Sequence, residues 1–69
     1  MTKHYEVKIP RGADMGDVDP FRVTTTGRGD SMQAARDYAL WVFNRMRTHD
    51  GLRHADSLPE GTTITRTID

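Results

Sequence analysis

The alternation of apolar and polar residues predicts a short strand near the beginning of the chain. In residues 4–9 (HYEVKI), Tyr5, Val7 and Ile9 fall on one side of an extended backbone and polar residues fall on the other. This period of two is typical of a strand with one buried face. Pro10, which has no backbone N–H to donate, is expected to end the strand.

Two later segments also have the composition of strands. Residues 21–26 (FRVTTT) alternate, and residues 62–68 (TTITRTI) are rich in threonine and isoleucine, which suit a pleated surface. In the second segment Arg66 lies on the same side as the two isoleucines. An inward charge of this kind is typical of an edge strand, where it discourages aggregation.

The longest periodic segment, residues 30–49 (DSMQAARDYALWVFNRMRTH), predicts one amphipathic helix. Asp30 is expected to cap its first turn, with Gln33 reaching back, and Asp50-Gly51 is expected to end it. At about 100° per residue, one side is apolar and is expected to face the core: Met32, Ala35, Ala39, Val42, Phe43 and Met46. The opposite side is polar apart from one leucine: Gln33, Arg36, Asp37, Leu40, Asn44 and Arg47.

A second group of apolar residues gives the helix more apolar surface than packing against one sheet requires. Ala34, Tyr38 and Trp41 extend the arc to about 200°, whereas a surface helix commonly shows about 100°. Two interpretations remain open. In the first, Trp41 packs beside the sheet edge or under the C-terminal loop. In the second, Tyr38 and Trp41 face a partner, since aromatic residues are enriched at contact surfaces. The second is slightly favoured, and the predicted partner-binding residues are Ala34, Tyr38, Trp41 and Arg45.

The order of these elements predicts a single small α+β domain over residues 1–69. A hairpin makes the first two strands antiparallel, and a crossover helix returns the third strand beside the first. We therefore expect β-β-α-β, a three-stranded antiparallel sheet in the order 2-1-3, with one helix packed on one face. The other face is expected to be polar, unshielded and slightly basic.

Length and charge narrow the range of functions. A single core below about 70–80 residues rarely supplies more than about 3–5 kcal/mol of net stability, and the chain has no cysteine. A homodimer or a bound protein partner would add buried area. Ten basic and ten acidic residues balance, so no overall field attracts nucleic acid or a membrane. The sequence shows no membrane span and no signal peptide, and we expect a cytoplasmic protein.

No pattern of residues indicates an active site or a metal site. The aspartates of residues 11–19 lack the spacing of a calcium loop. After the helix, His49, Asp50, His54 and Asp56 lack the tightly spaced pairs of a zinc site. A chain this short also offers no deep pocket. We therefore expect a non-enzymatic protein with no catalytic residues, metal, cofactor or small-molecule substrate.

Basic residues suggest an alternative function as a nucleic-acid-binding accessory protein. Lys8 and Arg22 would project from the exposed sheet face, and Arg36 and Arg47 from the helix. Basic groups near aromatic side chains are the usual means of binding single strands. The balanced net charge argues against a dedicated binder of this type.

The first two strands and the helix resemble the N-terminal domain of HicB-like antitoxins. The matching segments are HYEVKI, an acidic turn with glycine, FRVTTTG and GDSMQAARDYA, over residues 4–43. As in that family, the Gly29-Asp30-Ser31 step introduces a helix with small residues at intervals of three and four. The family's Pro-rich segment and C-terminal DNA-binding module are missing. The resemblance implies a small partner-binding domain without catalysis, and it identifies no toxin. We expect a protein-binding or self-associating module, a regulator or inhibitor of the kind that phages and mobile elements encode.

Overall fold

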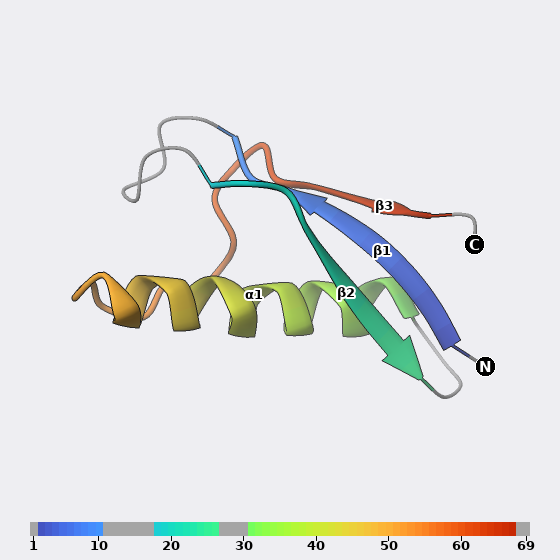
Figure 1. Ribbon diagram of the computed structural model, residues 1–69, viewed down its shortest axis with the longest axis horizontal. Coiled ribbons are helices and arrows are strands. Elements are labelled where there is room, and N and C mark those ends of the chain that lie inside the picture. The colour runs from blue at the N-terminus through green and yellow to red at the C-terminus, as the bar shows by residue number, and fades with distance from the viewer. Residues whose placement is uncertain (1, 11–17, 27–30, 68–69) are drawn as a thin grey trace.

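The computed structural model describes residues 2–10, 18–26 and 31–67. Within them the chain forms three strands and one helix: β1 (Thr2–Lys8), β2 (Phe21–Thr26), α1 (Ser31–His49) and β3 (Thr63–Arg66). The element order β-β-α-β is the predicted one (Figure 1). The predicted helix cap Asp30 and the loop over residues 11–17 lie outside the described residues.

The sheet is antiparallel and has the order β2-β1-β3, which confirms the predicted topology. At its centre, Tyr5 of β1 is paired with Val23 of β2 on one side and with Arg66 of β3 on the other. Directly opposed residues point to the same face, so Arg66 shares the face of Tyr5, as expected for an edge strand. Beyond β3, the backbone N–H of Thr67 donates to the carbonyl of His4 at 2.9 Å.

A tight turn delays the start of β3. The backbone N–H and the hydroxyl of Thr62 both donate to the carbonyl of Pro59, at 3.1 and 2.6 Å. Gly61, at the third position of this turn, has a φ of +86°, a value that glycine adopts without strain. Thr62 therefore closes the turn, and β3 begins at Thr63, one residue later than predicted, and ends at Arg66. Residue 68 of the predicted strand lies outside the described residues.

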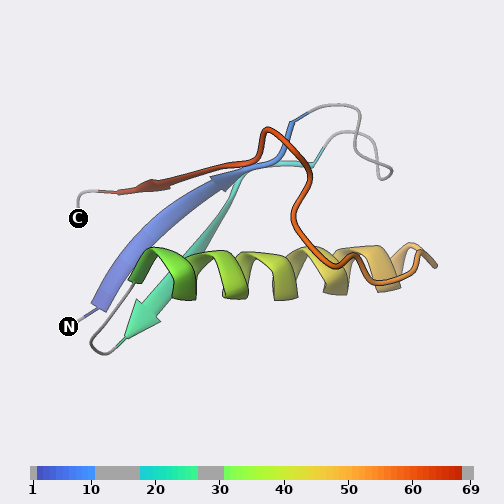
Figure 2. The same ribbon diagram turned by 180° about the vertical axis from the view of Figure 1, so that it is seen from behind.

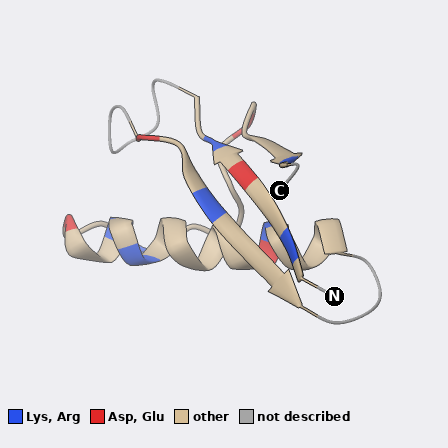
Figure 3. Ribbon diagram, turned by 45° about the vertical axis from the view of Figure 1, so that its right-hand side comes forward, with Lys and Arg blue, Asp and Glu red and all other residues tan. Residues whose placement is uncertain are grey.

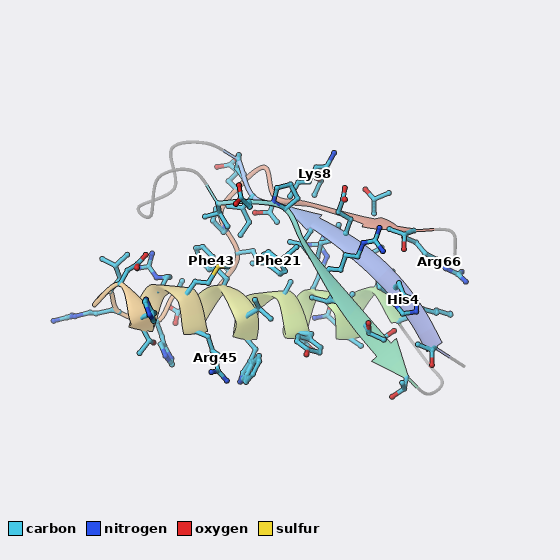
Figure 4. The ribbon with its side chains drawn as sticks, viewed as in Figure 1. His4, Lys8, Phe21, Phe43, Arg45 and Arg66 are labelled. Atoms are coloured by element: carbon cyan, nitrogen blue, oxygen red, sulfur yellow. The ribbon has the colours of Figure 1, made fainter. Side chains whose placement is uncertain are left out.

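The core lies between the sheet and α1. The helix crosses one face of the sheet, and no other described element covers the opposite face (Figures 1 and 2). Two of the buried helix residues are alanines, whose small side chains let the helix approach the strands closely. Phe43 and Phe21 lie between the two layers (Figure 4). The buried hydrophobic residues of the described chain are Tyr5, Val7, Ile9, Val23, Ala35, Ala39 and Phe43.

Three helix residues differ from the prediction based on periodicity. Val42, predicted to face the core, is only partly buried and lines a surface groove with Trp41 instead of packing with the core residues. Met32, predicted to face the core, lies in the first turn and is 37% exposed, and the first buried residue of the helix is Ala35. Leu40, predicted on the polar side, packs against the core. The segment that follows the helix folds back along this side, where Leu40 and Leu58 line the same groove. The prediction for Met32, Val42 and Leu40 is therefore wrong.

The helix ends at Asp50-Gly51, as predicted. The N–H of Leu52 donates to the carbonyl of Arg47 at 2.8 Å, and the N–H of Gly51 donates to the carbonyl of Thr48 at 3.0 Å. This is the hydrogen-bond pattern of a Schellman motif. The motif requires a left-handed residue, and Gly51 supplies it with a φ of +80°. The chain is thereby turned back along the helix.

The returning segment is fixed to the helix by Asn44. The side-chain amide nitrogen of Asn44 donates to the carbonyl of Ala55 at 3.1 Å, and the N–H of Ala55 donates to Oδ1 of Asn44 at 2.7 Å. Nearby, Nε of Arg47 donates to the carbonyl of Arg53 at 2.6 Å. Ala55 and Leu58 then pack against the core. The side of the helix that was predicted to face solvent is therefore partly covered by the chain itself.

Candidate functional site

One side of α1 is covered neither by the sheet nor by the returning segment. Four exposed residues follow one another on it at intervals of three and four, which makes them neighbours on the helix surface. We call them the helix stripe: Ala34, Tyr38, Trp41 and Arg45. The large side chains Tyr38 and Trp41 are 45% and 55% exposed. Arg45 points away from the sheet (Figure 4).

The side chains of the helix stripe contact one another. The rings of Tyr38 and Trp41 meet edge to face, with their centroids 5.8 Å apart and their planes at 86°. The guanidinium carbon of Arg45 lies 5.0 Å from the centroid of the Trp41 ring, which is a cation–π contact. Both geometries are favourable for these groups. The three side chains therefore hold one another in place on the surface, and less entropy is lost when such a surface binds a partner.

Shallow grooves of about 580 Å³ each flank Trp41. Trp41 and Arg45 line both grooves, so they form a ridge between them. One groove is completed by Val42, Met46, His49 and Asp50. The other is completed by Asn44, Thr48, His49 and His54. A ridge between open grooves suits contact with side chains of another macromolecule, whereas small molecules are commonly held in enclosed pockets.

Trp41 is 55% exposed, so the described residues do not bury it against the sheet or the C-terminal segment. The returning segment covers the side of the helix that carries Leu40 and Asn44, and its His54 borders a groove beside Trp41 without burying the ring. Trp41 therefore does not pack under the C-terminal segment. Its contact with a partner stays a prediction.

A hydrogen bond at the margin of the helix stripe was not predicted as part of the site. Nε2 of Gln33 donates to Oδ1 of Asp37 at 3.0 Å. Both residues were expected only to form the polar side of the helix. Their spacing of four residues is the sequence signal for such a pair. The bond holds a carboxylate that directly precedes Tyr38 in the chain and lies three residues after Ala34.

The four residues predicted for nucleic-acid contact lie on two separate surfaces. Lys8 and Arg22 lie on the open sheet face, and Lys8 points away from the helix (Figure 4). Arg36 and Arg47 lie on α1, across the other face. On the open face, Nζ of Lys8 lies 3.6 Å from Glu6, and Arg22 is directly opposite Glu6 in the sheet. Basic and acidic residues are interspersed along the described chain (Figure 3).

Of the titratable residues near the end of the helix, His49 and His54 line the same groove beside Trp41, whereas Asp56 lines the groove of Leu40 and Leu58. Nδ1 of His49 lies 3.7 Å from Asp50, whereas Nε2 of His54 lies 3.0 Å from the hydroxyl of Thr48. Among the residues that the structure describes, no group of three or more His, Cys, Asp or Glu is placed to hold a metal ion. No helix in this part of the chain has both the length and the apolar character of a membrane span.

The comparisons with known proteins find no match: no protein-family model, no curated protein and no solved structure matches this chain. The resemblance to HicB-like antitoxins therefore depends only on the sequence features described above.

Proposed function

We propose that this protein is a non-enzymatic protein-binding module whose contact surface is the helix stripe. The observation that carries this proposal is the exposure of Tyr38 and Trp41 on a side of the helix that the described residues leave uncovered. Tryptophan, tyrosine and arginine are enriched among the few residues that contribute most of the binding energy at protein interfaces. Covering the exposed half of one large aromatic side chain contributes about 2–3 kcal/mol at about 25 cal/mol per Å².

The small core of the chain supports the same proposal. Only Ala35, Ala39 and Phe43 of α1 are buried, and two of these side chains are a single methyl group. Any partner that binds the folded chain and not the unfolded chain adds to its stability. Such a module would serve as a small regulator or inhibitor of the kind that phages and mobile elements encode, which acts by occupying a surface of its target.

An affinity-capture experiment tests the proposal. The wild-type protein and a Tyr38→Ala/Trp41→Ala variant are immobilised and exposed to lysate of the native host, and the captured proteins are identified. Circular dichroism first establishes that the variant is folded, which is expected because both side chains are exposed. We expect the variant to lose the specific partners of the wild type.

A Lys8→Ala/Arg22→Ala variant is the matched control. It also removes two exposed side chains, but from the open sheet face. We expect it to capture the same proteins as the wild type. If the helix-stripe variant retained every specific partner of the wild type, the contact surface would lie elsewhere and the proposal would be refuted.

A further inference from the structure

The exposed side of α1 has the residue spacing of a coiled-coil seam. The alternating intervals of three and four that define the helix stripe continue by one residue at each end, to Ser31 and Thr48. Residues at these intervals form the a and d positions through which paired helices contact each other. We call the six residues the seam: Ser31, Ala34, Tyr38, Trp41, Arg45 and Thr48.

The seam is complementary to itself when two copies are antiparallel. With the middle of one helix against the middle of the other, Tyr38 of each copy lies opposite Trp41 of the other. The next layer places the small Ala34 opposite the long Arg45, and the last places Ser31 opposite Thr48. In a parallel pair, by contrast, Arg45 would face Arg45, and two like charges would meet at the seam. The order of the residues therefore favours the antiparallel arrangement.

An acceptor for Arg45 lies where the antiparallel arrangement requires it. Arg45 of a second copy would enter the space over Ala34, which is bordered on the helix surface by Gln33 and Asp37. The carboxylate of Asp37 is exposed and is held by the hydrogen bond from Gln33 at 3.0 Å. Twofold symmetry would form this pair of opposite charges twice.

The charge of the whole chain does not oppose such an association. Ten basic and ten acidic residues give a formal net charge of zero, so two copies do not repel each other at long range. A helix of 19 residues is about 28 Å long. A seam of this length buries the area of a weak, reversible contact rather than that of an obligate dimer.

We propose that the partner at the helix stripe is a second copy of this chain, bound antiparallel with Arg45 of each copy beside Asp37 of the other. This inference rests on the proposed function and names the partner. Reversing one charge would set like charges together at both ends of the seam. Reversing the opposite charge in the second protein would restore complementary pairs.

The test measures association of the wild type, Arg45→Glu and Asp37→Arg by analytical ultracentrifugation at low salt. We expect the wild type to dimerise and each single variant to raise the dissociation constant at least tenfold, which corresponds to about 1.4 kcal/mol. An equimolar mixture of the two variants is expected to form heterodimers with an affinity near that of the wild type. Arg36→Glu, an exposed charge change outside the seam, is the matched control and is expected to dimerise normally.

Emission from Trp41 gives a second measurement, because it is the only tryptophan of the chain. We expect a shift to shorter wavelength as the wild-type concentration rises, and none for either single variant. A wild type that is monomeric up to about 1 mM, where an association of about −4 kcal/mol would be evident, would overturn the inference. Dimerisation unaffected by Arg45→Glu would overturn it as well. A monomer that captures a different protein through Trp41 would leave the proposed function intact.

Discussion

The carboxamide of Asn44 forms hydrogen bonds with both backbone polar groups of Ala55, one as donor at 3.1 Å and one as acceptor at 2.7 Å. Asn44 thereby pairs with the backbone N–H and carbonyl of Ala55, as a neighbouring strand would in a sheet. Ala55 lies in a segment that forms neither a helix nor a strand. The bonds keep the returning segment on the Leu40 side of α1. The side that carries Trp41 therefore stays exposed.

Replacement of Asn44 by alanine is expected to loosen the returning segment. The variant would leave the N–H and the carbonyl of Ala55 without these partners in a partly buried position, which costs about 1–3 kcal/mol. Urea denaturation followed by circular dichroism measures the loss. Arg36→Ala, at an exposed position of the same helix, is the control and is expected to change stability by less than about 0.5 kcal/mol. Equal stability of the two variants would contradict a structural role for Asn44.

The residue at the end of α1 tests the Schellman motif. At Gly51 an added Cβ would meet no atom within 4 Å, so a substitution there is opposed only by the φ of +80°. Gly51→Ala is expected to lower the free energy of unfolding by about 1–2 kcal/mol, the cost of a left-handed alanine. Gly51→Asn is expected to cost less, because asparagine tolerates this conformation better. Thermal denaturation of both variants measures the difference, and an alanine variant as stable as the wild type would be inconsistent with the observed backbone.

Two alanine substitutions test which residues of α1 pack against the core. Leu40→Ala removes a side chain that packs against the core, and we expect a loss of about 2 kcal/mol. Met32→Ala removes a side chain that is 37% exposed, and we expect a loss below about 1 kcal/mol. Periodicity alone predicts the reverse order. Chemical denaturation of the two proteins under identical conditions decides between these outcomes.

The charge on the edge strand is expected to limit association through the sheet. Arg66 lies on β3, which is paired only with β1 among the described strands. Arg66→Val would remove the charge from the side of β3 that carries Ile64, and an edge strand without such a charge is a template for further strand pairing. We expect faster aggregation, measured by light scattering and thioflavin fluorescence. Thr65→Val, on the opposite face of the same strand, is the control, and similar aggregation of the two variants would argue against a protective role for the charge.

Titration with nucleic acid tests the alternative function. Because Lys8 and Arg22 lie on one face of the sheet and Arg36 and Arg47 lie across the other, they form no continuous basic surface. We expect no change in anisotropy of labelled DNA or RNA at low salt. Binding that weakens linearly with the logarithm of the salt concentration would show that phosphate contacts exist and would support the alternative.

The local patterns of the sequence determined the elements and their order. Alternation at Tyr5, Val7 and Ile9 and a helical period from Ser31 to His49 were sufficient to predict β-β-α-β, because burial of one face imposes these periods directly. A hairpin between the first two strands and a crossover helix before the third then left few topologies, and the order 2-1-3 followed. The helix end at Asp50-Gly51 was also predictable, since the left-handed residue of a Schellman motif is commonly glycine.

Only the tertiary structure decided which sides of the helix are covered. Periodicity gives the angle of each residue around α1, but it does not say where an irregular segment will lie. The contact between Asn44 and Ala55 places that segment over Leu40, while Met32 in the first turn stays 37% exposed. The exposure of Trp41 follows from these long-range contacts, because side-chain burial depends on residues that are distant in the sequence.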